Sequence, residues 1–96
     1  MATSRNGVTR EQVEYARTKP ILEVVKPILE KLRKSGTDTY VALCPFHNEK
    51  TPSLTIYLSS NSFFCYGCQK GGDLIKFIML FYGCNFVEAV RWLQEN

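Results

Sequence analysis

The feature that most limits how this chain can fold is a set of four potential metal ligands arranged in two pairs. Cys44 and His47 are separated by two residues, and Cys65 and Cys68 repeat this spacing after a gap of seventeen residues. Two ligands three positions apart on a tight turn can both reach one ion, and a second pair completes a tetrahedron. The spacing therefore predicts that the two pairs meet at a single metal ion.

The types of ligand indicate a structural zinc ion, one per chain. Three thiolates and one imidazole suit Zn²⁺, and four protein ligands leave no open position for water. His47 is the only histidine in the chain, which argues against a chance match. Iron in the same cage is the alternative metal, because thiolate-rich tetrahedra also accept it.

Two disulfides would be another way to use these cysteines. The first residues of the chain contain no apolar signal-peptide core, so we expect a cytoplasmic protein, in which thiols stay reduced. Cys84 stands apart from the two pairs, directly before a predicted helix. We expect it to pack against Ala89 as a hydrophobic staple, with a redox role as the alternative.

The residues around the two pairs favour an antiparallel sheet. Strand-forming residues run from Thr39 into Cys44, and residues 53–58 alternate between apolar and polar side chains. A turn at residues 59–61 leads to a returning strand over residues 62–65. We expect the glycine pair at residues 71–72 to form the turn that follows the second ligand pair.

Helices are predicted on both sides of this sheet. Thr9 and Gln12 form a capping box for a helix that ends near Arg17, and Pro20 opens a second helix that Pro27 stops or kinks.

Two more helices follow the second ligand pair. Asp73 caps an apolar, buried helix over residues 74–82, which Gly83 ends. Asn85 and Glu88 open a last helix that reaches about Gln94. Its inward stripe is predicted to contain Phe86, Ala89, Val90 and Leu93.

The expected fold class is α+β: a zinc-ribbon antiparallel sheet of three to four strands with flanking N-terminal and C-terminal helices. Residues 1–8 are small and polar and are expected to be disordered, and residues 9–96 are expected to form a single zinc-binding domain. Residues 28–34 have helical propensity, but the turn that follows them also allows a hairpin strand. No segment approaches the ~20 apolar residues that span a bilayer, so no membrane partner is expected.

Two stretches of the chain carry a resemblance to a known family. CPFHNEKTPSL at residues 44–54 and FFCYGCQKGGDLIKFIM at residues 63–79 resemble the zinc-binding (CHC2-type) domain of bacterial DnaG-type primases. The resemblance covers about residues 10–95 and implies that residues 28–34 pair as a strand. It also implies a domain that helps select the template start site for RNA primer synthesis in DNA replication.

The resemblance implies partners as well: single-stranded DNA template, a primase catalytic domain or polymerase in cis or in trans, and a replicative helicase. A full primase would continue past Asn96 into a metal-dependent polymerase domain. We therefore expect either an excised primase domain or a free-standing relative of a phage, plasmid or other mobile element. A protein-interaction adaptor and a stand-alone single-strand binder are the alternative functions.

Aromatic and basic residues of the predicted sheet are the candidates for DNA binding, because single strands stack on aromatic rings while cations contact the phosphates. The net charge of +3 is mild, and charge alone favours a solvated basic face. The candidates expected on the solvent face or beside it are Lys50, Tyr57, Tyr40, Phe64, Arg33 and Lys34.

No catalytic residue is predicted, because the chain shows no paired-acid motif, no P-loop and no nucleophile beside a base. We therefore expect the chain to be no enzyme on its own and to form the template-binding part of a primase whose catalytic domain lies elsewhere.

Overall fold

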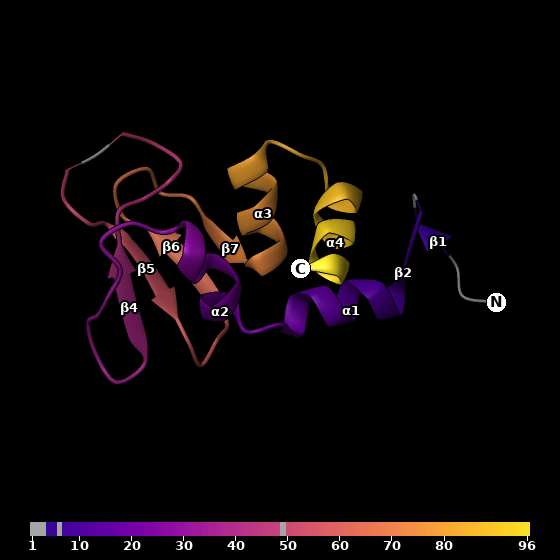
Figure 1. The fold of residues 1–96 in the computed structure, drawn as a ribbon, viewed down its shortest axis with the longest axis horizontal. Coiled ribbons are helices and arrows are strands. Elements are labelled where there is room, and N and C mark those ends of the chain that lie inside the picture. The colour runs from indigo at the N-terminus through magenta and orange to yellow at the C-terminus, as the bar shows by residue number, and fades with distance from the viewer. Residues whose placement is uncertain (1–3, 6, 49) are drawn as a thin grey trace.

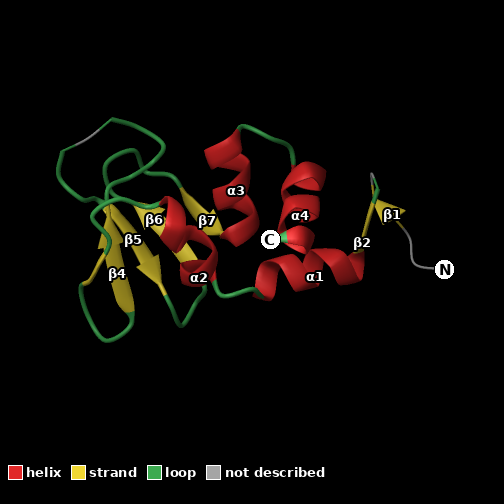
Figure 2. Ribbon diagram, viewed as in Figure 1, coloured by secondary structure: helices red, strands yellow, loops and turns green. Residues whose placement is uncertain are grey.

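The computed structural model describes residues 4–5, 7–48 and 50–96, which form an elongated molecule with extents of 47 × 27 × 21 Å. Figure 1 shows a sheet at one end, two C-terminal helices beside it, and a short pair of strands near the N-terminus at the other end. The strands of the main sheet thus occupy a different part of the molecule from the helices α1 (Arg10–Thr18), α3 (Leu74–Tyr82) and α4 (Phe86–Glu95) (Figure 2).

The described chain begins with β1 (Ser4–Arg5) and β2 (Val8–Thr9), which pair antiparallel. Gly7 in the turn has a φ of 97°, a conformation that glycine adopts without strain. Val8 is buried in the core. Within the stretch expected to be disordered, residues 1–3 and 6 lie outside the described residues, and the others form this hairpin.

Helix α1 (Arg10–Thr18) confirms the predicted capping box. The backbone N–H of Gln12 donates to the Thr9 hydroxyl over 3.1 Å, and the Gln12 side chain accepts from the Thr9 N–H over 2.9 Å. Both bonds satisfy donors that an uncapped first turn would leave without a helical partner.

Helix α2 (Ile21–Val25) continues into a 3₁₀ turn, η1 (Lys26–Ile28), that contains Pro27. The proline ends the α-helix as predicted, because it has no N–H to donate. The next strand is β3 (Arg33–Lys34), which pairs with β4 (Thr39–Ala42). Residues 28–34 are therefore neither a helix nor a full strand, and the strand implied by the family resemblance is limited to the last two residues.

Five strands form one antiparallel sheet in the order β3-β4-β5-β6-β7. This confirms the α+β class and exceeds the three to four strands expected. The three central strands match the predicted ones: β4 (Thr39–Ala42), β5 (Leu54–Tyr57) and β6 (Ser62–Cys65).

The additional strand is β7 (Gly71–Asp73), which pairs with β6 along one edge of the sheet. The prediction of a turn at Gly71 and Gly72 was wrong, because strand pairing with a distant segment is not visible in local composition. A Cβ atom on Gly71 would lie 2.6 Å from Cδ1 of Phe64, so glycine lets the phenyl ring lie close to the strand.

One face of the sheet contributes to the hydrophobic core. Leu54 and Ile56 of β5 and Phe63 and Cys65 of β6 are buried on it, together with residues of α2 and α3. Phe63 packs edge-on against Phe77 of α3, with ring centroids 5.1 Å apart. The alternation predicted for β5 is thus confirmed, and its polar face is the one that points away from the core.

Helix α3 (Leu74–Tyr82) has the predicted bounds. The Asp73 carboxylate accepts the backbone N–H of Lys76 over 2.9 Å, and Gly83 ends the helix in the left-handed conformation, with a φ of 65°. Four of its apolar side chains are buried: Leu74, Ile75, Phe77 and Ile78.

Helix α4 (Phe86–Glu95) begins at the predicted capping box of Asn85 and Glu88. Three residues of its predicted inward stripe are buried, namely Ala89, Val90 and Leu93. The prediction was wrong for the fourth residue of the stripe, Phe86, which is 41% exposed. It lies in the first turn of the helix beside an open hollow of the surface, where no segment of the described chain covers it.

The turn between β5 and β6 joins the sheet to the helices. The Asn61 side chain accepts the N–H of Ile21 and donates to the carbonyl oxygens of Arg17 and Lys19, over distances of 2.8, 3.0 and 2.8 Å. One side chain of the sheet thereby fixes the link between α1 and α2.

Candidate metal centre

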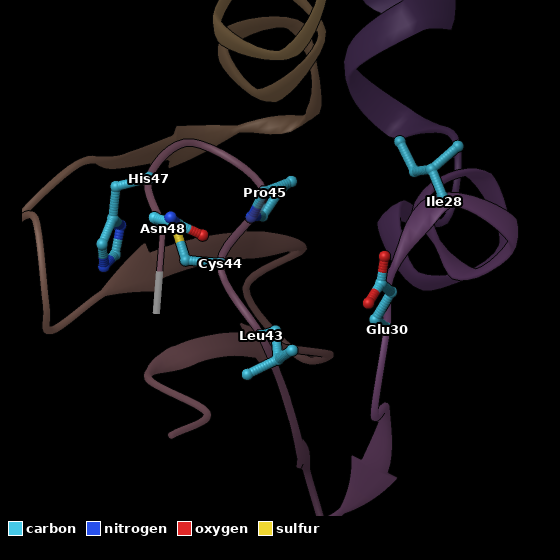
Figure 3. Close-up of a pocket in the computed structure, with 7 residues that line it drawn as sticks. All are labelled: Ile28, Glu30, Leu43, Cys44, Pro45, His47 and Asn48. Atoms are coloured by element: carbon cyan, nitrogen blue, oxygen red, sulfur yellow. The ribbon is translucent and has the colours of Figure 1, made fainter. Parts of the chain in front are cut away.

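The first ligand pair lies directly after β4, on a short turn that we call the first knuckle (residues 44–47) and that Figure 3 shows from one side. The backbone N–H of Phe46 points to the Cys44 sulfur over 3.4 Å. The Phe46 ring packs against Phe63 and Phe77, with centroid distances of 5.8 and 5.0 Å. The turn is therefore attached both to its own sulfur ligand and to the core.

The second knuckle (residues 65–68) follows β6 in the same way. The N–H of Cys68 points to the Cys65 sulfur over 3.5 Å, and the N–H of Gln69 donates to the Cys65 carbonyl oxygen over 2.7 Å. A Cβ atom on Gly67 would lie 2.8 Å from the Ser53 hydroxyl oxygen and 2.9 Å from Nε2 of His47. Glycine at this position lets the two knuckles approach each other.

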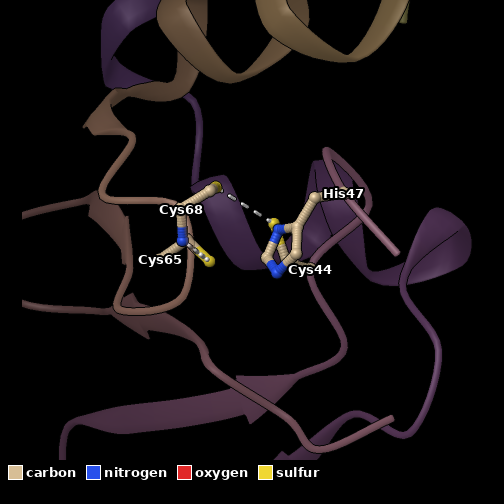
Figure 4. Close-up of side chains that lie close together, drawn as sticks. All are labelled: Cys44, His47, Cys65 and Cys68. Carbon is tan, nitrogen blue, oxygen red and sulfur yellow. Dashed lines mark hydrogen bonds between the residues drawn. The ribbon is translucent and has the colours of Figure 1, made fainter. Parts of the chain in front are cut away.

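The four predicted ligands converge in one cluster (Figure 4). One ligand atom from each of Cys44, His47, Cys65 and Cys68 lies within 4.8 Å of all the others. The Cys44 and Cys68 sulfurs are 3.8 Å apart. Two sulfurs bound at ~2.3 Å to a tetrahedral ion stand about 3.8 Å apart, whereas a disulfide bond is ~2.05 Å long. The cluster fits a tetrahedral metal ion and excludes a Cys44–Cys68 disulfide in this state.

The surroundings of the thiols explain what the metal must overcome. Burial raises the pKa of the Cys44 thiol to about 12 in the metal-free protein. Burial also acts on Cys65, but hydrogen bonds from Ser53 and from the Cys68 N–H outweigh it and lower the pKa of that thiol. Metal binding needs thiolates, so the ion must displace the proton of Cys44 against a raised pKa. The lowered pKa of Cys65 makes the loss of its proton easier.

A closed set of four protein ligands makes this a structural centre. The bound ion supplies a crosslink between the end of β4 and the end of β6, with no coordination site left for a substrate. Cys84 takes no part in it: its thiol donates to the Ile78 carbonyl oxygen over 3.8 Å, and burial raises its pKa. Cys84 packs partly buried against the core, as expected of a structural cysteine, while its staple contact with Ala89 stays a prediction.

The face of the sheet opposite the core carries a group of aromatic side chains next to the second knuckle. Tyr57 and Phe64 project from β5 and β6 on this outer face, and the pairing places Arg33 there too. Phe64 contacts the ring of Tyr66 edge-on, with centroids 4.9 Å apart, and the hydroxyls of Tyr57 and Tyr66 are hydrogen-bonded. We call Tyr57, Phe64 and Tyr66 the aromatic platform.

Tyr66 is the residue that the sequence-based candidate set missed. It is 61% exposed, the largest exposure among the exposed large apolar side chains of the described residues. The available signal was its position two residues after Phe64, since alternate residues of an extended strand face the same side.

The other three candidates, Tyr40, Lys34 and Lys50, lie away from this aromatic platform. Tyr40 was a candidate for the solvent face, but it pairs with Ile56 and therefore lies on the core face, where it packs partly buried against the core. Lys34 is opposite Tyr40 and holds its ammonium 5.7 Å from the ring centroid. Lys50 is exposed in the loop between the first knuckle and β5.

A small ribbon-like sheet with two ligand-bearing knuckles and a closed Cys₃His centre defines the zinc-ribbon class of structural zinc domains. The match to a family model is specific: residues 8–96 match the model of the CHC2 zinc finger. The chain belongs to this family, the zinc-binding domain of bacterial DnaG-type primases. The prediction of one structural zinc ion is confirmed with it.

Similar proteins carry the same domain within longer chains. The DNA primase of Rickettsia prowazekii (strain Madrid E) is 45% identical over 90 residues, which cover 93% of this chain and 15% of that primase. The DNA primase of Mycolicibacterium smegmatis is 42% identical over 96 residues, which cover 100% of this chain and 15% of that one. The chain thus spans about 15% of the length of these curated relatives.

A solved structure shows the same fold. The crystal structure of the Aquifex aeolicus primase (zinc binding and RNA polymerase domains) matches with a TM-score of 0.80 and 35% sequence identity, over 92% of this chain and 21% of that chain. Among the described residues of the present structure, no helix has the length and apolar character needed to cross a bilayer.

Proposed function

We propose that this domain binds single-stranded DNA template on the outer face of its sheet and helps select the start site for RNA primer synthesis. The observation that carries the proposal is the aromatic platform, which lies beside the zinc centre with Arg33 on the same face of the sheet. The similarity to DNA primases over nearly the whole chain supports it.

The platform suits bases rather than phosphates. Successive bases of a single strand stack on aromatic side chains, each contributing ~1–3 kcal/mol, while nearby cations contact the backbone. Tyr66 lies between the ligands Cys65 and Cys68, so the zinc ion fixes the segment that presents one of the three rings. In this proposal zinc acts as a scaffold, and the sheet supplies the contacts to the template.

A titration against ionic strength tests the proposal. The labelled probe is oligo-dT, and fluorescence anisotropy gives the dissociation constant at several salt concentrations. Each phosphate contacted in a single strand adds about −0.7 to the slope of log affinity against log salt. With Arg33 and Lys50 as the cations, we expect a slope near −1.4, and Arg33→Ala should make it less negative by about 0.7.

Variants of the platform test the location. Tyr57→Ala, Tyr66→Ala and Lys50→Ala should each weaken oligo-dT binding, by ~1–3 kcal/mol for a lost stacking ring, at an unchanged zinc content. Tyr15→Ala is the matched control, because Tyr15 is also half-exposed but lies on α1. If the platform variants bind like the parent, the outer face is not the template surface. Lys34→Ala and Tyr40→Phe test in the same way whether the other two candidates, on the core face of β3 and β4, contribute to binding.

On its own the domain is proposed to make no primer. Phosphoryl transfer needs metal ions on clustered carboxylates, and the metal centre described here is a closed Cys₃His site. The catalytic domain is proposed to act in cis or in trans in the cytoplasm, together with a replicative helicase. Labelled ribonucleotide incorporation on a single-stranded template, with and without a separate primase polymerase domain, tests this. Primer made by the repurified domain alone would contradict it.

A second candidate function, a protein-interaction adaptor, is favoured by a different surface. Tyr82 and Phe86, at the link between α3 and α4, are 48% and 41% exposed although both are large and apolar. Such side chains are enriched at protein interfaces. Calorimetric titration with a primase polymerase domain should give a weaker signal for Tyr82→Ala and an unchanged one for Tyr57→Ala if the adaptor function holds.

A further inference from the structure

We propose that a pocket beside the first knuckle receives one guanine base of the bound strand; this rests on the proposed template-binding function. The pocket has a volume of about 190 Å³ and lies between the segment after α2 and the start of the first knuckle (Figure 3). It is separate from the aromatic platform, since none of the three platform rings lines it.

The size of the pocket selects a small ligand. Its volume corresponds to about six water molecules at ~30 Å³ each, and it is below the ~300 Å³ at which pockets for drug-sized ligands begin. One planar base is therefore a better match than a nucleoside triphosphate or a peptide segment.

Backbone pairing makes the walls of the pocket definite. One wall of the pocket contains Ile28 and Glu30, and the other is formed by the segment that begins at Leu43. The N–H of Leu43 donates to the carbonyl oxygen of Glu30 over 2.9 Å, which joins the two walls. Ile28, Leu43 and Pro45 supply apolar surface, against which the face of a base can pack. The metal crosslink holds the wall that ends in Cys44 and His47.

The polar groups of the pocket favour a ligand edge that donates hydrogen bonds. The structure records no hydrogen bond or ion pair for the Glu30 carboxylate with any other described residue, and Glu30 is exposed at the pocket. Three thiolates on Zn²⁺ leave a net charge of −1 next to it. Two negative charges disfavour a phosphate at this place and favour N–H donors.

Guanine is the base whose pairing edge matches a carboxylate best. It presents two adjacent donors, N1–H and N2–H, which two carboxylate oxygens can accept together. Adenine and cytosine offer one amino donor next to an acceptor, and thymine offers one donor between two acceptors. The amide of Asn48, on the other wall, supplies a donor suited to the guanine O6.

The position of the pocket is compatible with the proposed path of the strand. Arg33 lies on the outer face three residues after Glu30, in the edge strand that pairs with β4. A strand that stacks on the platform and crosses the sheet to Arg33 reaches β3, three residues after the pocket residue Glu30. Since single-stranded nucleic acids are read on unstacked bases, a base turned out next to Arg33 is a candidate to enter the pocket.

The test compares three labelled 12-mers that differ at one central position: oligo-dT, the same strand with one guanine, and the same strand with one hypoxanthine. Hypoxanthine lacks the amino group of guanine and keeps the rest of the pairing edge. The parent chain should bind the guanine strand about tenfold more tightly than oligo-dT, because a bidentate contact to a base edge discriminates against bases that cannot form it. The hypoxanthine strand should lose most of this preference.

Glu30→Gln should remove the preference for guanine over hypoxanthine and leave the affinity for oligo-dT and the zinc content unchanged. Glu23→Gln is the matched control, because Glu23 is an exposed carboxylate of α2 that does not line the pocket. Equal binding of all three strands by the parent would overturn the pocket proposal and leave the template-binding function intact.

A second measurement separates the two proposals if no strand binds. Deoxyguanosine monophosphate and deoxyinosine monophosphate are titrated into the ¹⁵N-labelled chain, and the amide signals of Leu43 and Asn48 are followed. Shifts caused by the guanine nucleotide, weaker with the hypoxanthine nucleotide and absent in Glu30→Gln, would support the pocket even without strand binding. No shift in the parent would overturn it.

Discussion

The sheet end and the helical end of this molecule are stabilised by different means. The strands of the main sheet are two to four residues long, and its two knuckles lie largely outside regular structure. The helical end instead consists of α1, α3 and α4, each with a side-chain cap and buried apolar residues. The knuckles need an ion to fix their geometry, whereas the helices are fixed by burial and local hydrogen bonds. Substitutions at the two ends should therefore have different consequences.

The largest expected effect is the loss of a zinc ligand. Cys68→Ser should remove the ion and unfold most of the domain, because structural zinc contributes on the order of 10 kcal/mol, as much as the stability of an average domain. Zinc content and far-ultraviolet circular dichroism of the purified variant measure both consequences. The matched control is Cys84→Ala, which should keep one zinc per chain and lose only packing within the helical layer.

A well-folded, zinc-free Cys68→Ser protein would contradict the assignment of Cys68 as a ligand. A variant in which the helical signal persists while the sheet is lost would sharpen the comparison, since it would show that the helical end folds without the metal.

The next largest effect is expected where the two ends meet. Phe77 of α3 is fully buried and contacts Phe46 of the first knuckle and Phe63 of β6. Phe77→Ala should destabilise the domain by ~3–5 kcal/mol through lost burial and a cavity, while one zinc stays bound. Phe81→Ala, on a half-buried neighbour, should have a smaller effect. Thermal unfolding with a zinc assay measures this, and loss of zinc from Phe77→Ala would show that the two ends are not separable.

The helical end was predictable from sequence because its signals are local. The caps at Thr9, Asp73 and Asn85 each lie within three residues of the group that they bond, and the bounds of α3 follow from Asp73 and Gly83. The zinc ligands were predictable for a similar reason, because each ligand pair is separated by only two residues and is therefore visible as a local pattern.

The remaining features depend on pairing between distant segments. Strand β7 contains two glycines and has little strand propensity, so only its pairing with β6 makes it a strand. Tyr40 follows the same alternation as its neighbours, but the register with β5 decides which face it occupies. Phe86 fits the spacing of the helical stripe, but no other segment of the described chain packs over the first turn of α4, so its ring stays exposed.

Asn61 offers a way to loosen the joint between the two ends without touching either core. Asn61→Ala removes three hydrogen bonds from the turn between β5 and β6 to the link between α1 and α2. We expect a loss of about 3 kcal/mol, because each of the three bonds contributes ~0.5–1.5 kcal/mol and alanine is also less suited to the φ of 51°. Urea unfolding at saturating zinc gives the value.

Two substitutions at the same position separate the causes. Asn61→Gly keeps the backbone conformation but loses the bonds, and Asn61→Asp keeps the acceptor for the Ile21 N–H but loses both donated bonds. If Asn61→Ala is as stable as the parent, the joint does not depend on this side chain.

The smallest effect is expected for a substitution that lies entirely within the helical end. Asn85→Ala removes the side-chain acceptor of the Glu88 N–H, a bond of 2.8 Å at the start of α4. The helix then begins with one more unsatisfied donor, and the domain should lose ~1 kcal/mol, whereas Asn85→Gly should lose only a few tenths. Glu88→Ala removes the reciprocal bond to the Asn85 N–H and serves as the companion variant. Because Asn85 and Glu88 lie outside the metal cluster, competition with a chromogenic chelator should give the parent's zinc affinity for all three variants. A reduced zinc affinity in Asn85→Ala would mean that a cap in α4 is coupled to the knuckles, and the distinction between a metal-held end and a burial-held end would then fail.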